Sequence, residues 1–385
     1  MTNRMTTVSG LRHALAIGAL IAAMLGAADL ALSAANSQSR AAPDYLFNDS
    51  HFHLTNYVQK GTDIHKYVEQ IMGDKIGRST LFGIPLQQTW AYGNSGDFAP
   101  TYYLQSDAPL YYYSFTDAYI ARAYQALPKE QQARLDPMIT GFNPVDMYGV
   151  DHIRRVLELF PGIFSSIGEF TIHKEFVSSK VAGETASLTN PALDRILDFA
   201  GEVGLAVIIH SDIDMPFAKA GAEPVYLTQM KDLLRRHPKT TIIWAHIGLG
   251  RVVHPVQGQA TEEAAERSPA YQQIVEQLVD DPTLAHVYYD ISWDEVAKYA
   301  IASPEVEKRV ADMLNSHPNR FLFGTDNVAP LDQATQLRVY HLWDPVWAQL
   351  TPEASLNVRK GNYERIFDAA RARVRAWEKA NVKPL

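Results

Sequence analysis

Two histidines two positions apart are the first residues in this chain whose types and spacing could do chemistry. They are His51 and His53 in the segment FNDSHFH, residues 47–53. In an extended strand the side chains at positions i and i+2 point to the same side, so the two imidazoles could bind one cation. The alternative is a pair of unrelated surface histidines, and further ligands elsewhere in the chain must decide between the two.

The composition limits the ligands and partners of such a site. The 385 residues include no cysteine, which excludes disulfides and thiolate metal sites. Imidazole and carboxylate remain, and these ligands suit zinc, manganese or iron. The hydrophobic fraction of 46% is enough for one large core or two ordinary domains. A formal net charge of −8 and a pI near 5.9 give no basic field for nucleic acid, so we expect a small-molecule substrate.

The N-terminal segment has the features of a signal peptide. Arg4 and Arg12 precede an apolar run at residues 14–28, and small residues follow at 33–35. This run is shorter than the roughly 20 residues of a membrane span, so an uncleaved anchor fits less well. A wrongly assigned start site is the other alternative. We expect a signal peptide at 1–35, a polar linker at 36–43 and one domain at 44–385. The mature protein is then exported, periplasmic or extracellular, without stable membrane insertion.

Strand-like and helix-like stretches alternate beyond the linker. With residues 47–53 included, eight strands are expected, the others at 79–85, 137–144, 164–170, 205–212, 240–248, 286–293 and 320–327. Helices with apolar residues three and four positions apart are expected at 151–160, 192–204, 227–238, 271–281 and 304–318. The helices at 227–238 and 304–318 end in His-Pro, which stops a helix. Eight strand–helix units predict a closed parallel (β/α)8 barrel, the TIM-barrel fold.

Chemistry in such a barrel gathers at the carboxyl ends of the strands. Five of the expected strands end in a histidine or an acid: His51 and His53 in the first, Glu169 in the fourth, His210 in the fifth, His246 in the sixth and Asp326 in the eighth. A polar residue that closes an apolar run leaves the packed interior and faces the mouth of the barrel. We therefore expect these side chains to converge.

This order of motifs resembles the amidohydrolase superfamily. HxH, the fifth-strand histidine, AHIG and FGTD are most similar to the amidohydrolase-related (amidohydrolase 2) branch, which holds hydrolases and nonoxidative decarboxylases of carboxylated rings. The likeness covers roughly residues 45–370, including GNYERIF at 361–367. It implies one divalent metal rather than two, usually zinc with manganese as the alternative. The implied ligands are His51, His53, His210 and Asp326, with His246 beside the metal as an acid, a base or an oxygen polariser.

The chemistry of these residue types agrees with the implied roles. Asp326 can accept a proton from an activated water, and His246 can stabilise charge on a substrate oxygen. These two are the expected catalytic residues. Glu169 either bridges two cations or hydrogen-bonds a ligand histidine. His173 and Lys174 are expected in a loop beyond the fourth strand.

An insertion after the second strand is crowded with aromatic residues. Trp, Tyr and Phe recur through residues 90–124, and such rings could form a lid over a flat or apolar substrate. The alternative is that they cover the core or the interface of a homo-oligomer. Trp293 and Arg251 are expected to face the pocket, where Arg251 could hold a substrate carboxylate. An ordinary surface ion pair is the alternative for Arg251.

Together these features favour a metal-dependent hydrolase of the amidohydrolase type. The expected reaction is attack of metal-activated water on a lactone, ester or amide of a small organic acid. The first alternative is a lyase, a nonoxidative decarboxylase of a ring carboxylate. The second is a non-catalytic binding protein of the cell envelope, although such a protein has little need of Asp326 beside two histidines.

Overall fold

The computed structural model describes residues 44–56, 61–84, 115–174, 187–213, 223–250 and 271–383. It also gives the backbone of seven short strands: β4 (Leu86–Gln87), β5 (Thr89–Trp90), β6 (Leu104–Gln105), β7 (Tyr111–Tyr112), β10 (Val177–Ser178), β11 (Lys180–Val181) and β12 (Glu184–Thr185). Tyr45–Leu385 forms one compact unit. The expected signal peptide and linker lie outside the described residues. Among the helices described, none is both long and apolar enough to cross a bilayer.

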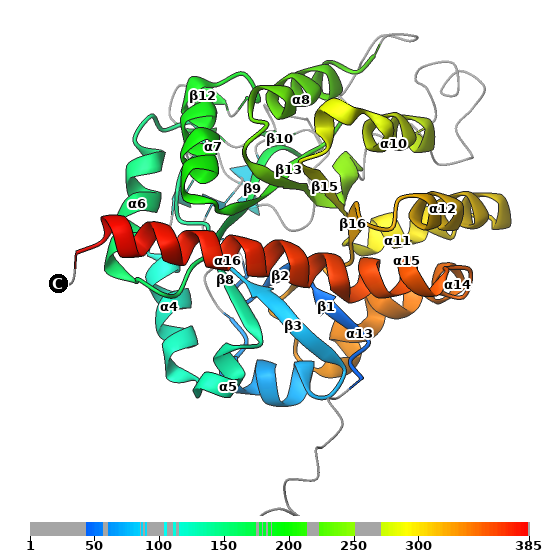
Figure 1. The fold of residues 1–385 in the computed structure, drawn as a ribbon, viewed down its shortest axis with the longest axis horizontal. Coiled ribbons are helices and arrows are strands. Elements are labelled where there is room, and N and C mark those ends of the chain that lie inside the picture. The colour runs from blue at the N-terminus through cyan, green and yellow to red at the C-terminus, as the bar shows by residue number, and fades with distance from the viewer. Residues whose placement is uncertain are drawn as a thin grey trace, which may run out of the picture. The chain divides into compact units, whose positions relative to one another are not determined.

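Eight parallel strands form the central sheet, in the order β1-β3-β8-β9-β13-β14-β15-β16 (Figure 1). They are β1 (Phe47–Asp49), β3 (Ile76–Leu81), β8 (Leu135–Ile139), β9 (Ser166–Lys174), β13 (Ala206–Ser211), β14 (Thr241–Trp244), β15 (Val287–Asp290) and β16 (Phe321–Leu322). The two ends of the sheet meet where β2 (Phe52–His53) pairs in parallel with β17 (Asn327–Val328). The Ser50 N–H also donates to the Phe323 carbonyl at 3.1 Å. The predicted TIM barrel is confirmed.

The strands are buried on both faces, as parallel strands covered by helices must be. Along β13, Ala206 and Ile208 pack inside the barrel, whereas Val207 and Ile209 pack outward against the helices. The neighbouring β14 keeps the same register, with Ile208 opposite Ile243. This alternation every second residue places His210 on the inward face, with Ala206 and Ile208.

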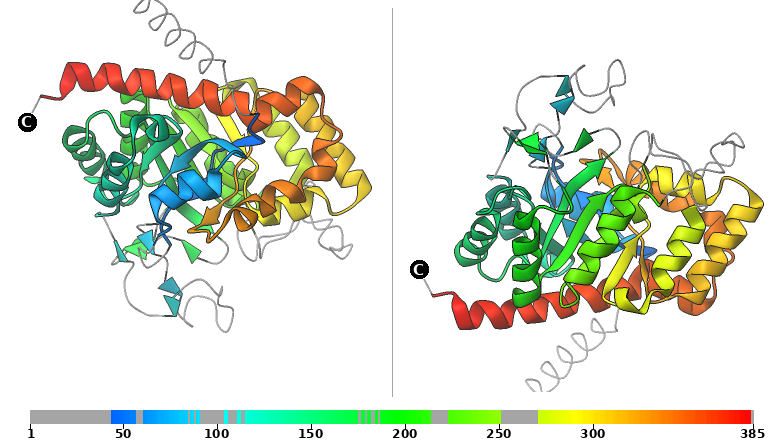
Figure 2. Two further views of the ribbon diagram at one scale, coloured as in Figure 1. Left: turned by 90° about the horizontal axis from the view of Figure 1, so that it is seen from below. Right: turned by 90° about the horizontal axis from the view of Figure 1, so that it is seen from above.

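Helices surround the strands (Figure 2). They are α2 (Ile64–Lys66), η1 (Tyr67–Met72), α4 (Thr116–Ala126), α5 (Lys129–Gln132), α6 (Gly149–Leu159), α7 (Pro191–Val203), α8 (Val225–Arg236), α10 (Tyr271–Asp280), η3 (Pro282–Leu284), α11 (Asp294–Ala300), α12 (Pro304–Ser316), α13 (Gln333–Leu342), α14 (Asp344–Trp347) and α15 (Pro352–Leu356). All five expected helices are confirmed. Local signals set their ends: Asn190 caps α7 and Gly204, with φ 87°, ends it. His237 and His317 end α8 and α12.

The last helix, α16 (Asn362–Asn381), follows η4 (Asn357–Gly361) and crosses the strands in Figure 1. Its Tyr363, Ile366, Phe367 and Ala370 pack against the residues that fill the barrel interior. Asn362, the asparagine of the GNYERIF segment, donates to the carbonyls of Pro318 and Phe321 at 2.8 Å each. These carbonyls lie at the amino end of β16, so α16 closes this end of the barrel and leaves the carboxyl ends for chemistry.

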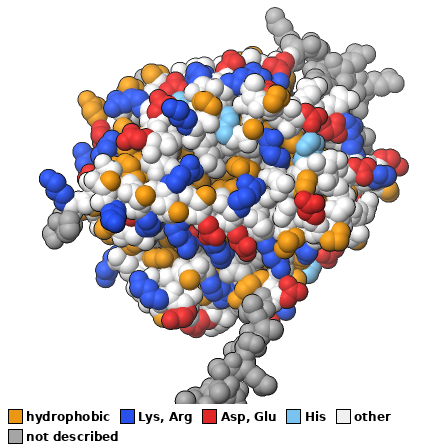
Figure 3. Space-filling model, in the orientation of Figure 1, with side chains coloured by type: hydrophobic (Ala, Val, Ile, Leu, Met, Phe, Trp, Pro, Cys, Tyr) orange, Lys and Arg blue, Asp and Glu red, His pale blue; other side chains and the backbone are white. Residues whose placement is uncertain are grey.

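A buried carboxylate fastens α16 to the barrel. Asp136 on β8 accepts hydrogen bonds from Arg78 at 2.8 Å, from Arg371 at 2.5 Å and from the Tyr363 hydroxyl at 2.8 Å. Arg78 also reaches the exposed Asp368 on α16 at 2.7 Å. On the face over α16, Lys and Arg side chains alternate with Asp and Glu, without a patch of one sign (Figure 3).

Several details differ from the sequence-based expectations. His173 and Lys174 were wrongly expected in a loop: β9 continues through both, because β10 folds back and pairs with them. Glu169 therefore lies within β9 and does not end it. The expected first strand is two short strands, β1 and β2, with His51 between them, and the second begins at Ile76 instead of residue 79. Most of the expected aromatic lid lies outside the described residues.

Candidate metal centre

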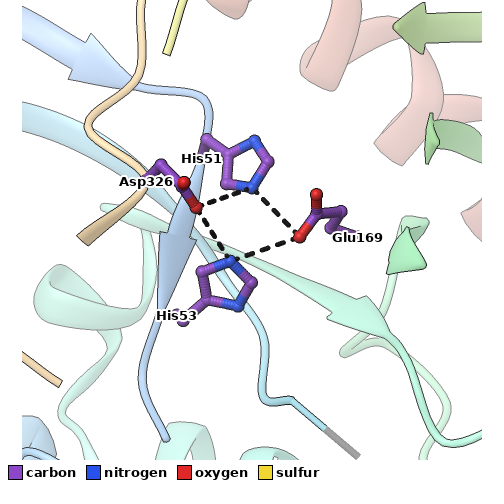
Figure 4. Close-up of side chains that lie close together, drawn as sticks. All are labelled: His51, His53, Glu169 and Asp326. Carbon is purple, nitrogen blue, oxygen red and sulfur yellow. Dashed lines mark hydrogen bonds and ion pairs between the residues drawn. The ribbon is translucent and has the colours of Figure 1, made fainter. Parts of the chain in front are cut away.

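The HxH pair faces one point at the mouth of the barrel. The backbone turns between β1 and β2, and the His51 N–H donates to the Asp49 carboxylate at 3.1 Å. Both rings point to the same oxygen, because Asp326 Oδ1 lies 3.3 Å from His51 Nε2 and 3.2 Å from His53 Nε2 (Figure 4). The expected convergence of the two imidazoles is confirmed.

Glu169 completes the group from the opposite side. Its Oε2 lies 3.5 Å from His51 Nε2 and 3.4 Å from His53 Nε2 (Figure 4). The preceding Gly168 has φ 114°, and a Cβ there would stand 2.2 Å from the carbonyl oxygen of Ile208. Only glycine allows this approach of β9 to β13, so Gly168 helps to set the position of Glu169.

Asp326 reaches the centre from the turn between β16 and β17. It adopts a left-handed φ of 55°, and its N–H donates to the His51 carbonyl at 2.8 Å. The buried Asp49 carboxylate holds the turn by accepting from the Thr325 hydroxyl and from Gln336, each at 2.7 Å. Burial raises the pKa of Asp49 to about 7, against the lowering effect of its hydrogen bonds from Thr325 and from the His51 N–H. Asp49 thus joins the strand that carries His51 to the turn that carries Asp326.

The four side chains suit a divalent cation. One nitrogen or oxygen from each of His51, His53, Glu169 and Asp326 lies within 4.8 Å of the others. His51 Nε2 is buried and has no hydrogen-bond partner in the described part of the chain, although it faces two carboxylates. Two imidazoles and two carboxylates are a common ligand set for zinc and manganese. The residues present therefore fit the metal that the sequence predicts.

His210 and His246 form a second group with Glu169. His210 Nδ1 lies 2.8 Å from Glu169 Oε1, and its Nε2 lies 3.1 Å from Asp212. The structure therefore places His210, an expected ligand, beside the four-residue group and not in it. His246 follows β14 in η2 (Ala245–Gly248), with its Nε2 3.7 Å from Glu169 and 3.8 Å from Asp326.

The centre attracts positive charge. Burial alone would raise the pKa of Glu169 and of Asp326, but the surrounding histidines hold both pKa values well below their usual range. Burial lowers the pKa of His51, but Glu169 and Asp326 outweigh this effect and raise it well above its usual value. Burial lowers the pKa of His246, which favours the neutral ring. Two ionised carboxylates thus face a neutral His246.

Comparison with known proteins supplies the family. The sequence profile of the family described as Amidohydrolase matches residues 49–368, most of the chain. The chain belongs to the amidohydrolase family. No curated protein matches it.

Several solved structures resemble this amidohydrolase. A Pseudomonas putida protein provisionally described as a 2-pyrone-4,6-dicarboxylic acid hydrolase has 14% identity and a TM-score of 0.48, covering 84% of this chain and 98% of its own. Dihydroorotase from Campylobacter jejuni has 12% identity and a TM-score of 0.46, covering 84% of each chain. 2,6-Dihydroxybenzoate decarboxylase from Rhizobium has 13% identity and a TM-score of 0.40, covering 79% of this chain and 86% of its own. Likeness at this level does not assign a reaction.

The residues around the amidohydrolase centre include two that the sequence did not single out for it. Asp290 Oδ2 lies 2.7 Å from His51 Nδ1. It ends β15 in the run VYYD, so the strand-end rule applied to the seventh strand would have found it. Lys174 holds its Nζ 5.6 Å from the ring centre of Trp293.

Of the two expected substrate contacts, the structure describes one. Trp293 is buried, and its ring centre lies 5.1 Å from that of His246. Its φ of 82° is unusual for a bulky residue and turns the chain sharply after β15. Trp293 therefore stands beside the metal centre, where a wall of the pocket was expected. Arg251 lies outside the described residues.

Proposed function

We propose that this protein is a metal-dependent hydrolase that cleaves a lactone, ester or amide of a small organic acid. The family and the barrel support an enzyme of the amidohydrolase type. The observation that carries the proposal is the convergence of His51, His53, Glu169 and Asp326 within 4.8 Å. A purely binding protein would have no need of two ionised carboxylates beside a neutral imidazole.

The four-residue group would hold one divalent ion, zinc in the first place and manganese as the alternative. When bound, the ion would supply Lewis-acid activation of water and of the substrate carbonyl. The chain supplies the rest of the chemistry. Glu169 serves both groups, because its Oε2 faces the HxH pair and its Oε1 binds His210.

Asp326 is the residue best placed to accept a proton from the attacking water. Its side chain is 13% exposed, and the nearby histidines keep its pKa far below neutrality, so it is ionised at neutral pH. His246 is neutral and buried, with its Nε2 3.8 Å from Asp326 Oδ2. This gap is too long for a direct hydrogen bond, so a proton passes between the two side chains only through a bridging water or substrate atom on its way to the leaving group.

Metal analysis of the purified protein, followed by a screen of lactones, esters, amides and ring carboxylates, tests the proposal. We expect one bound ion per chain and hydrolysis that Asp326→Asn abolishes. Asp312→Asn is a matched control, because Asp312 forms an exposed ion pair with Lys308 and should keep full activity. Release of carbon dioxide without hydrolysis would contradict the hydrolase assignment and favour a decarboxylase. Inactivity of the zinc-loaded protein on every substrate would favour a binding protein.

Export is also part of the proposal. It is supported by the two arginines and the apolar run that begin the sequence, followed by small residues at 33–35. We expect that the protein recovered from outside the cytoplasm begins near residue 36. N-terminal sequencing of the exported protein tests this expectation. Retention of residues 1–35 would contradict the signal peptide.

A further inference from the structure

A series of hydrogen bonds joins His51 and His246 on the side of their rings that faces away from Glu169 and Asp326. His51 Nδ1 lies 2.7 Å from Asp290 Oδ2. The Ser292 hydroxyl lies 2.9 Å from the same Oδ2 and 3.0 Å from His246 Nδ1. Asp290 Oδ1 accepts from the Ser292 N–H at 2.8 Å. All four residues are buried.

The number of available hydrogens decides which atoms donate in this series of hydrogen bonds. An ionised carboxylate only accepts, so both His51 Nδ1 and the Ser292 hydroxyl must donate to Asp290. A hydroxyl has one hydrogen, and Ser292 gives it to Asp290. The Ser292 oxygen can therefore only accept from His246 Nδ1. The Ser292 carbonyl oxygen, 3.3 Å from the same Nδ1, is an acceptor too.

A neutral imidazole with its hydrogen on Nδ1 has a bare Nε2. The Nε2 atoms of His51 and His246 both face the centre, and neither has a hydrogen-bond partner among the residues described. We infer that Asp290 and Ser292 are positioning residues that hold the Nδ1 hydrogens of His51 and His246, so that a bare Nε2 faces the metal centre in the neutral ring of His246 and, once a metal displaces its second proton, in His51. The inference rests on the proposed metal, since it explains how His51 is prepared as a ligand.

The same geometry assigns a direction to the proton transfer of His246. Its resting ring offers a lone pair to the centre and no hydrogen. His246 therefore begins the reaction as a proton acceptor and becomes a donor only after it has taken a proton. This resolves the choice among acid, base and oxygen polariser that the sequence left open.

Asp290→Asn should reverse the tautomer of His51. The Ser292 N–H holds an oxygen at the Oδ1 position, so the new amide nitrogen takes the place of Oδ2 and donates to His51 Nδ1. The imidazole then carries its hydrogen on Nε2, where the cation should bind. Asp290→Ala only removes the acceptor and leaves His51 free to adopt either tautomer.

Zinc affinity, measured by competition with a chromophoric chelator, and urea unfolding of the same variants test the inference. Loss of a partner of a ligand histidine typically costs 10–100-fold in metal affinity. We expect about 100-fold weaker zinc binding for Asp290→Asn and about tenfold for Asp290→Ala. The free energy of unfolding should fall less for Asp290→Asn than for Asp290→Ala, because Asn keeps the volume and most of the polar contacts that Ala removes. If Asn were the milder change in both assays, Asp290 would be merely structural and the inference would fail.

Asp117→Asn is the matched control. Asp117 is also buried, accepts from His152 Nε2 at 2.8 Å and from the Thr140 N–H at 2.8 Å, and belongs to neither metal-binding group. It should keep wild-type zinc affinity. Wild-type protein that binds no zinc would contradict the proposed function, whereas wild-type and Asp290→Asn proteins that bind zinc equally would overturn only the inference.

A measurement on the wild-type protein covers the case in which the Asp290 variants do not fold. Long-range ¹H–¹⁵N correlation of histidine-labelled protein reports which ring nitrogen carries the hydrogen. We expect the hydrogen of His246 on Nδ1, with or without zinc. A hydrogen on Nε2 of the neutral His246 ring would overturn the inference.

Discussion

Asp136→Asn tests how α16 is held against the amino end of the barrel. Asp136 is fully buried between the guanidinium groups of Arg78 and Arg371 and also accepts from Tyr363. The substitution keeps the size of the side chain but removes its charge. Breaking a buried ion pair on one side costs about 3–5 kcal/mol, because the remaining charge loses its partner. The side chains of Arg78 and Arg371 are 16% and 36% exposed, so water can partly solvate their charges and we expect about 3 kcal/mol.

Urea unfolding followed by circular dichroism measures this loss as the difference in the free energy of unfolding. Asp368→Asn is the matched control, because Asp368 pairs with the same Arg78 but its side chain is 60% exposed. An exposed ion pair contributes about 0–1 kcal/mol, so this variant should be close to wild type. Zinc affinity should be unchanged in both variants, since α16 lies at the end of the barrel away from the metal centre.

Equal stability of the two variants would refute this reasoning. It would mean that burial does not set the contribution of the carboxylate, and that apolar packing of α16 alone closes the barrel. A loss of zinc binding in Asp136→Asn without loss of stability would also contradict it, because the contacts of Asp136 join α16, β3 and β8 and none reaches the metal centre.

Three further perturbations have defined outcomes. Gly324→Ala puts a Cβ 2.8 Å from that of His51 and should weaken zinc binding about tenfold by chelator competition; unchanged affinity would show that His51 is not displaced. Glu169→Gln should also weaken zinc binding, and wild-type affinity would exclude Glu169 as a ligand. His173→Phe keeps the ring stack on Tyr226 but removes a group whose pKa burial lowers from 6.5 to about 4. Between pH 6.5 and about 4 the unfolded wild-type chain takes up a proton that the folded chain does not. The free energy of unfolding of the wild type therefore falls, as the pH is lowered, by up to about 1.4 kcal/mol per pH unit. The variant should lose less stability in urea unfolding as the pH falls, and equal slopes would contradict the lowered pKa.

The barrel and much of its metal centre follow from local sequence patterns. Each strand is a short apolar run, and a polar residue at its carboxyl end must leave the packed interior. This rule predicted that His51, His53, Glu169 and Asp326 would meet, although as many as 275 positions separate His51 from Asp326. The same rule would have found Asp290 at the end of β15.

Other features depend on contacts that a local pattern does not contain. β9 extends to Lys174 because β10 folds back and pairs with it, and the sequence around His173 contains no pattern that predicts this pairing. The left-handed φ angles of His246 and Asp326 aim their side chains, yet neither residue type requires such a backbone. The place of His210 depends on Asp212 and Glu169 together, so strand position alone could not distinguish a ligand from a neighbour.

The most direct test of the metal centre is the zinc content of wild-type protein and of the double variant His51→Ala, His53→Ala after equilibrium dialysis. The two imidazoles supply half of the four-residue group. We expect one zinc ion per wild-type chain and none in the folded double variant, with activity lost together with the metal. Stoichiometric zinc retained by the double variant would contradict the assignment of this centre.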